Sequence, residues 1–246
     1  MRIYISPHSD DVCFSIGHLA ARHGGELMNV FTSSLYVAAP MRLPFDRDQR
    51  VAFVSELRKR EDMRFAQAAD LRRHDLGLAE PPVIGLDSFD LSGLDQEVEA
   101  LSDRLIPYLI ALLSTDGDPN TAALYCPMGI GGHRNHVSIL LAVRDAYKAL
   151  ARLCTVWLYE DLHYASKPVA RRQGLSFAKN AFVGAELSPT VLRLDPAAVE
   201  RKLGWVGLYA SQHGRPPRPE DFTPASGAEQ SPHEMVWRVR ASQGQA

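Results

Sequence analysis

Blocks of apolar residues along the chain predict strands that alternate with helices. The run RIYIS at 2–6 predicts a strand, and the spacing of apolar residues from Ile16 to His23 predicts a helix that ends at Gly24. ELMNVFTSS at 26–34 predicts a second strand. Strand, helix and strand in this order indicate a βαβ unit, whose crossover is normally right-handed.

The rest of the chain continues this alternation. We predict helices over 51–72, over 94–113 with a kink at Pro107, after residue 136, and over about 197–210. We predict strands at PPVIGL (81–86), TAALYCP (121–127) and CTVWLYED (154–161), and irregular surface segments over 37–49 and, rich in proline, over about 214–232. The pattern predicts one α/β domain over 1–246, Rossmann-like, with a mainly parallel sheet flanked by helices.

Composition narrows the function classes. The chain has 246 residues, 46% of them hydrophobic, and a formal net charge of −2, which favours neither a nucleic-acid surface nor a polybasic membrane patch. Its 3 cysteines are too few and too scattered for a disulfide framework or a CxxC zinc site. The N-terminal run has no secretory signal pattern, and the longest apolar run, LIPYLIALL, is too short to cross a membrane. We expect a cytoplasmic protein whose partner is a small molecule, with no nucleic acid and no membrane.

Titratable residues follow each of three predicted strands. His8, Asp10 and Asp11 follow the first, His133 and His136 lie in the loop and helix start after 121–127, and Glu160 and Asp161 end the strand at 154–161. In a parallel sheet ligands gather beyond the carboxyl ends of the strands. We therefore expect these side chains to meet at one edge of the sheet.

This set of residues suits a hydrolytic metal site. A catalytic zinc takes three ligands from His and Asp or Glu and keeps a fourth position for water, and His8, Asp11 and His136 supply such ligands. Asp10 is then placed to take a proton from the water, and His133 to donate to developing negative charge. The site would cleave an amide or an ester.

Simpler interpretations exist for each motif alone. HSDD at 8–11 could be a helix N-cap cluster, since Ser and Asp favour such positions. The two histidines of HRNH at 133–136 could be surface residues at a helix start, and GIGG at 129–132 could be a plain turn or a phosphate cradle. The placement of both motifs at strand ends favours the metal site.

The sequence resembles the PIG-L/LmbE-like N-deacetylases. The resemblance is carried by SPHSDD at 6–11 and GGHRNH at 131–136, with further similarity in RKRED (58–62), LYEDLHYA (158–165) and KLGWVGLYASQ (202–212). It implies a zinc-dependent hydrolase that removes an acyl group, usually acetyl, from the nitrogen of an amino sugar or a glycosylated small molecule. A role in the biosynthesis of a secondary metabolite is a plausible setting.

Site residues carry over from the resemblance by position. It implies Zn²⁺ ligands at His8, Asp11 and His136, a general base at Asp10, and a histidine that steadies the oxyanion at His133. Among the predicted substrate contacts, Arg58 matches a substrate-contacting arginine, with a surface pair to Glu61 as the alternative. Glu160 and Asp161, also predicted to bind substrate, could instead support the ligands or cap a helix.

Two departures from the family pattern stand beside the site. Asn135 replaces the Asp that commonly precedes the ligand histidine, and loss of that charge could shift a pKa or the substrate preference. His163 replaces the Pro of YEDLPY, either as a local structural change or as a substrate contact.

The sequence also allows two alternatives to deacetylation of an amino sugar. The same metal site could cleave an amide in a thiol–sugar conjugate or an antibiotic precursor. A non-catalytic nucleotide-binding domain is disfavoured, because SPHSDD lacks the closely spaced glycines of a dinucleotide-binding turn.

Overall fold

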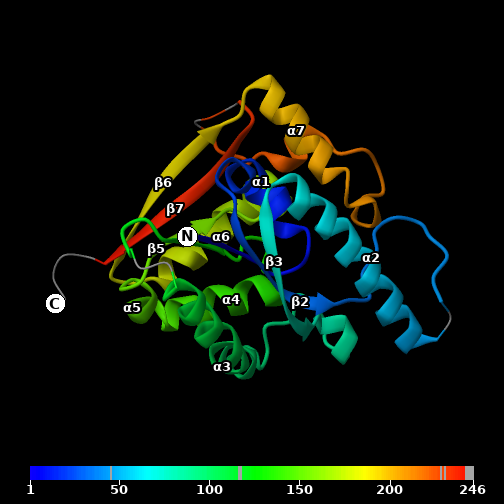
Figure 1. Ribbon diagram of the computed structural model, residues 1–246, viewed down its shortest axis with the longest axis horizontal. Helices are drawn as coiled ribbons and strands as arrows, with labels where there is room; N and C mark the ends of the chain where they lie inside the picture. Colours follow the sequence, from blue (N-terminus) through cyan, green and yellow to red (C-terminus); the bar gives the residue numbers. More distant parts are fainter. Residues whose placement is uncertain (45, 116–117, 228, 230, 242–246) are drawn as a thin grey trace.

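The computed structural model describes residues 1–44, 46–115, 118–227, 229 and 231–241. Its described part contains a seven-stranded sheet (Figure 1) with the strand order β3-β2-β1-β4-β5-β7-β6. The strands are β1 (Arg2–Ser6), β2 (Gly25–Ser33), β3 (Leu71–Ala79), β4 (Ala123–Pro127), β5 (Thr155–Tyr159), β6 (Ala185–Arg193) and β7 (His233–Ala241). The helices are α1 (Asp11–His23), α2 (Arg47–Ala68), α3 (Leu94–Leu113), α4 (Arg134–Asp145), α5 (Tyr147–Leu150), α6 (Pro168–Ala181) and α7 (Pro196–Val206).

The sheet is mainly parallel, as predicted. Strands β3, β2, β1, β4 and β5 pair in parallel, whereas β7 is antiparallel to both β5 and β6. Because β1 lies between β2 and β4, the chain leaves the sheet in opposite directions on either side of β1. In open α/β sheets a crevice for ligands forms at this point, beyond the carboxyl ends of the strands. The motifs at 6–11 and 131–136 both follow strands that border it.

Helices cover both faces of the sheet. Alternate residues of β1 point to opposite sides: Ile3 and Ile5 belong to the core shared with α3, α4 and α6, whereas Tyr4 belongs to the core shared with α1, α2 and α7. In Figure 1 α3 and α4 lie in the lower part of the view, whereas α7 lies at the top and α2 at the right. The arrangement confirms the predicted α/β fold class.

A buried ion pair supports α1, the helix that begins at Asp11. The helix is broken at Ile16, whose φ and ψ are −133° and 31°. The backbone N–H groups of His18 and Leu19 donate to the carboxylate of Glu234, each over 2.9 Å. Lys202 pairs with Glu234 over 2.9 Å and donates to the carbonyl of Ser15 over 3.2 Å. Backbone groups freed at the break thus find partners in the interior.

Several predicted elements differ from the structure. The helix predicted over 51–72 begins earlier, at the cap residue Asp46, and ends at Ala68, where β3 follows. PPVIGL is not a strand, because Pro81–Ile84 form a turn of 3₁₀ helix. The helix α3 continues through Pro107 without a break.

Strands β3, β6 and β7 and helix α6 were missing from the prediction. β3 and β6 are the two edge strands, and their mixed polar sequences (LRRHDLGLA and AELSPTVLR) lack an apolar run because one side of each is exposed. In the described part of 214–232, the regular structure is a 3₁₀ turn at Pro219–Phe222. No helix in the described ranges is long and apolar enough to span a membrane.

Candidate metal centre and active site

Three side chains at the switch point of the sheet bring their donor atoms together. His8 and Asp11 come from the loop after β1 and the start of α1, and His136 from the first turn of α4. His8 Nδ1 lies 3.0 Å from Asp11 Oδ2, Asp11 Oδ2 lies 3.3 Å from His136 Nε2, and His136 Nε2 lies 3.3 Å from His8 Nδ1. Ligands of a tetrahedral zinc, each about 2.0–2.1 Å from the ion, are about 3.3 Å apart. The triangle therefore fits the predicted cofactor, Zn²⁺.

In His8 and His136, a hydrogen bond outside the triangle shows which ring nitrogen carries a proton. His136 Nδ1 donates to Asp161 Oδ1 over 2.7 Å, and His8 Nε2 donates to Asn135 Oδ1 over 3.0 Å. Each ring therefore directs its other nitrogen into the triangle, where that nitrogen would be unprotonated when a metal ion is bound. A partner on the far nitrogen fixes the tautomer and the orientation of a metal-binding imidazole.

The charges around this triangle favour a cation. Burial lowers the pKa of His136, but the carboxylates of Asp11 and Asp161 outweigh it and raise this pKa to about 10. In Asp11 burial raises the pKa, and the two histidines outweigh it and hold the pKa well below its usual range. The carboxylates that favour protonated imidazoles would equally favour a divalent metal ion, whose binding would release those protons.

His133 differs from the other two histidines. It caps α4, and its Nδ1 accepts a hydrogen bond from the backbone N–H of Asn135 over 3.3 Å. Burial, followed by the charges of His8 and His136, lowers its pKa to about 2, so the ring is neutral. A neutral ring with Nδ1 as acceptor carries its proton on Nε2, which is then a donor. His133 can also be grouped with His8 and His136, with one ligand atom of each within 4.8 Å of the others.

Asp10 is held from behind by Arg58, which the prediction placed in a substrate contact or a surface pair. Arg58 is buried, and its guanidinium donates to Asp10 Oδ1 over 2.9 Å and to Glu80 Oε1 over 2.6 Å. It also donates to Ser34 Oγ over 2.8 Å. The other carboxylate oxygen of Asp10 has no hydrogen-bond partner among the described residues and is free for a water or a substrate.

The surface pair between Arg58 and Glu61 does not form. Glu61 is buried and accepts hydrogen bonds from the backbone N–H and the hydroxyl of Ser211, over 2.8 and 2.6 Å. The RKRED and KLGWVGLYASQ segments thus meet, and this contact brings Gln212 to the wall of the pocket.

Glu160 and Asp161 lie side by side and have different surroundings. Asp161 bonds His136, and its Oδ2 accepts from the N–H groups of Met128 and Ile130 over 3.1 and 2.8 Å. Those amides belong to the glycine-rich loop, so they are not free to cradle a phosphate. Glu160 is buried in a two-point pair with Arg171, over 2.6 and 2.7 Å. Neither carboxylate lines the pocket, so the structure gives no support to the predicted substrate contacts.

A pocket of about 290 Å³ opens over the triangle. Its lining joins the predicted residues His8, Asp10, Asp11, Arg58, His133 and His163 with residues that no motif predicted: Phe14, Tyr36, Glu80, Pro82, Ser88, Phe89, Leu162, Tyr164 and Gln212.

Glycine at 131 makes room for one of the unpredicted residues. A Cβ on Gly131, whose φ is +98°, would lie 2.4–2.8 Å from side-chain atoms of Tyr164. The bare backbone lets Tyr164 pack edge-on to His136, with ring centroids 5.9 Å apart. Tyr164 and Gln212 lie in the segments 158–165 and 202–212 that resemble the family, but only the fold shows that both line the pocket.

A Rossmann-like sheet with a metal-donor cluster at its switch point is the arrangement expected of a metal-dependent hydrolase. The chain is 29% identical over 265 residues to the 2'-N-acetylparomamine deacetylase of Streptomyces fradiae, covering 96% of this chain and 88% of that protein. No protein-family model matches it. The relationship along almost the whole chain confirms the resemblance to N-deacetylases found in the motifs, since the relative is itself a deacetylase.

Solved structures agree on the fold. A deacetylase of the teicoplanin biosynthesis pathway has a TM-score of 0.69 at 18% identity and covers 99% of both chains. The zinc-inhibited form of teicoplanin deacetylase has a TM-score of 0.66 at 18% identity, again over 99% of both chains.

Proposed function

We propose that this protein, acting as one domain over 1–246, is a zinc-dependent N-deacetylase for an acetylated amino sugar in a glycosylated small molecule of secondary metabolism. The observation that carries the proposal is the triangle of His8 Nδ1, Asp11 Oδ2 and His136 Nε2, with separations of 3.0–3.3 Å. The relationship to 2'-N-acetylparomamine deacetylase supports both the reaction and the class of substrate.

His8, Asp11 and His136 would hold the zinc ion, which polarises a carbonyl and lowers the pKa of water. Asp10 is the base in this proposal. Asp10 lines the pocket, and Arg58 holds one of its carboxylate oxygens. The other oxygen has no hydrogen-bond partner among the described residues, so the carboxylate can take a proton from the attacking water. The same carboxylate can then return the proton to the departing amine.

His133 is the oxyanion donor in this proposal. The capping bond to its Nδ1 leaves a proton on Nε2, and its depressed pKa keeps the ring neutral at pH 7. Because the start of the helix fixes this neutral donor, little free energy is needed to reorient it as negative charge develops on the amide oxygen.

The pocket walls suit a sugar. Glu80 and Gln212 offer an acceptor and an amide, and Tyr36 and Phe89 offer aromatic faces. Glu80 is held by Arg58 and Ser34, so its carboxylate is already oriented before substrate binds. Most hydrogen-bond donors of Arg58 are occupied by Asp10, Glu80 and Ser34. Arg58 therefore positions Asp10 and Glu80 in this proposal, in place of the substrate contact predicted for it.

The test combines zinc content with acetate release. Apoprotein is titrated with zinc from below one equivalent, because a structural neighbour is known in a zinc-inhibited form. Acetate release is measured on N-acetylglucosamine, its glycosides and an N-acetylated thiol–sugar conjugate. We expect release from sugar substrates that rises to about one zinc per chain and disappears with a chelator. Bound zinc with release only from the conjugate would contradict the proposed substrate, and absence of zinc binding would contradict the metal centre.

A further inference from the structure

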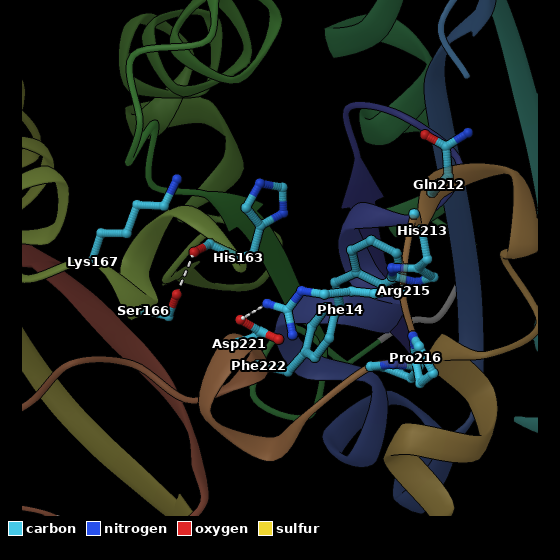
Figure 2. A pocket seen from close by; sticks show the side chains of 12 residues that line it. Phe14, His163, Ser166, Lys167, Gln212, His213, Arg215, Pro216, Asp221 and Phe222 are labelled. Carbon is cyan, nitrogen blue, oxygen red and sulfur yellow. Dashed lines mark hydrogen bonds and ion pairs between the residues drawn. The ribbon is translucent and has the colours of Figure 1, made fainter. Parts of the chain in front are cut away.

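A second pocket adjoins the active-site pocket and has a volume of about 280 Å³. Figure 2 shows it from close by. The two pockets share Phe14, His163 and Gln212 in their linings. Phe14 is tied to the active site, since its backbone N–H donates to the carbonyl of Asp10 over 3.0 Å. A molecule bound over the metal triangle could thus extend across Phe14 into the second pocket.

The walls of the second pocket are polar and its floor is aromatic. Ser166 and Lys167 form one side in Figure 2, and Gln212 and Arg215 come from the segment that forms the other side. Phe14 and Phe222 meet edge to face, with ring centroids 5.1 Å apart. Aromatic rings with a few polar groups around them suit a ring-shaped polar ligand. An aliphatic acyl chain would leave the polar walls without partners.

The pocket has more positive than negative charge. Arg215 pairs with Asp221 over 2.8 Å, so these two groups largely compensate each other. The ammonium of Lys167 has no hydrogen-bond or ion-pair partner among the described residues. Lys167 also precedes α6, whose first backbone N–H groups have no side-chain cap. Lys167 lines the second pocket, and His163, four residues before it, lines both pockets. Partial desolvation, followed by the charge of Lys167, lowers the pKa of His163.

We propose that this second pocket binds the part of the substrate that is linked to the acetylated amino sugar, and that Lys167 selects a substrate with an anionic group in that part. This inference rests on the proposed function. The aromatic floor binds the ring of the linked group, and Lys167 and the uncapped start of α6 provide the attraction for a carboxylate or phosphate. A cationic group would meet the unpaired charge of Lys167 and bind less well.

The experiment uses three phenyl glycosides of N-acetylglucosamine with the same shape, one unsubstituted, one with a 4-carboxylate and one with a 4-aminomethyl group. The zinc-loaded enzyme is assayed for kcat/KM on each at low salt, where exposed charges are least screened. We expect the order anionic, neutral, cationic, with about a three- to tenfold difference between the first and the last.

The charge-reversing variant Lys167→Glu should invert this order. The matched control is Lys179→Glu, which reverses an exposed charge on the same helix but outside the pocket. The control should keep the order of the unaltered enzyme. The readout is the ratio of kcat/KM values on the anionic and cationic glycosides, so a general loss of activity in a variant does not affect it.

Three results would overturn the inference, and they differ in what they say about the deacetylase function. Release of acetate from all three glycosides without a charge preference, or a ratio unchanged by Lys167→Glu, would remove the subsite but leave the deacetylase function. Absence of release from the glycosides and from N-acetylglucosamine itself would contradict the proposed function and, with it, the subsite.

Discussion

The donor side chains at the proposed metal position and the aromatic side chains of the outer pocket wall differ in burial and in the number of polar contacts that fix them. His8, Asp11 and His136 are buried, and each contacts at least two polar partners in its own short motif or in another loop. Tyr36 and Phe89 at the wall are each 56% exposed and come from irregular segments. Rigidity is needed where donor atoms must sit within tenths of an ångström, whereas the wall only has to match a substrate.

Loss of a ligand should have the largest effect. His136→Ala removes one corner of the donor triangle, and we expect zinc affinity to fall far more than the 10–100-fold typical of a supporting residue. Acetate release should fall by more than about a thousandfold. Zinc content after dialysis and the rate of release measure both effects. His23→Ala, which removes an exposed histidine from α1, should keep both, and a zinc-loaded, active His136→Ala would contradict the ligand assignment.

Loss of the base should separate metal binding from turnover. Asp10→Asn keeps the size of the side chain and its contact with Arg58 but removes the proton acceptor. We expect zinc content to be unchanged and kcat to fall by about 10²–10⁴-fold. Asp103→Asn, at an exposed position on α3, serves as the control. A variant at position 10 with nearly full kcat would show that another group takes the proton.

The predictable part of the site is the part that follows strands. His8 and Asp11 could be predicted because they lie within five residues of the end of β1, and His136 because it lies in the first turn of the helix that follows β4. The parallel core was predictable because β1, β2, β4 and β5 are rich in apolar residues and largely buried.

The unpredicted part depends on contacts between distant segments. Glu80 follows β3, an edge strand with a polar sequence, and its role appears only when Arg58 and Ser34 are brought to it. The sequence predicts that Arg58 contacts substrate or pairs with Glu61 at the surface, yet Arg58 is buried and the carboxylates of Asp10 and Glu80 compensate its charge. No local pattern contains that pairing, because the partners are 48 and 22 residues away.

A third variant distinguishes the adjacent carboxylates at the end of β5. Asp161→Asn weakens the acceptor on His136 Nδ1, and we expect zinc affinity to fall about 10–100-fold. Glu160→Gln is the matched control, because Glu160 bonds Arg171 and Trp237 rather than a metal-donor residue. Its loss should lower the melting temperature and leave zinc affinity unchanged. Competition of both variants with a zinc-binding dye measures the affinities, and equal losses would contradict the separation of their roles.

The smallest effect is expected at the wall. Tyr36→Ala removes an exposed aromatic face that lines the pocket and, among the described residues, makes no hydrogen bond to His8, Asp11 or His136. If the wall only binds the sugar, KM should rise by a few-fold, corresponding to about 1 kcal/mol, while kcat and zinc content stay the same. Phe53→Ala, at an exposed position on α2 outside the pocket, should change neither constant. A fall in kcat of a hundredfold or more would mean that the wall takes part in positioning the reacting atoms, and the contrast between the fixed donor triangle and the adaptable wall would be wrong.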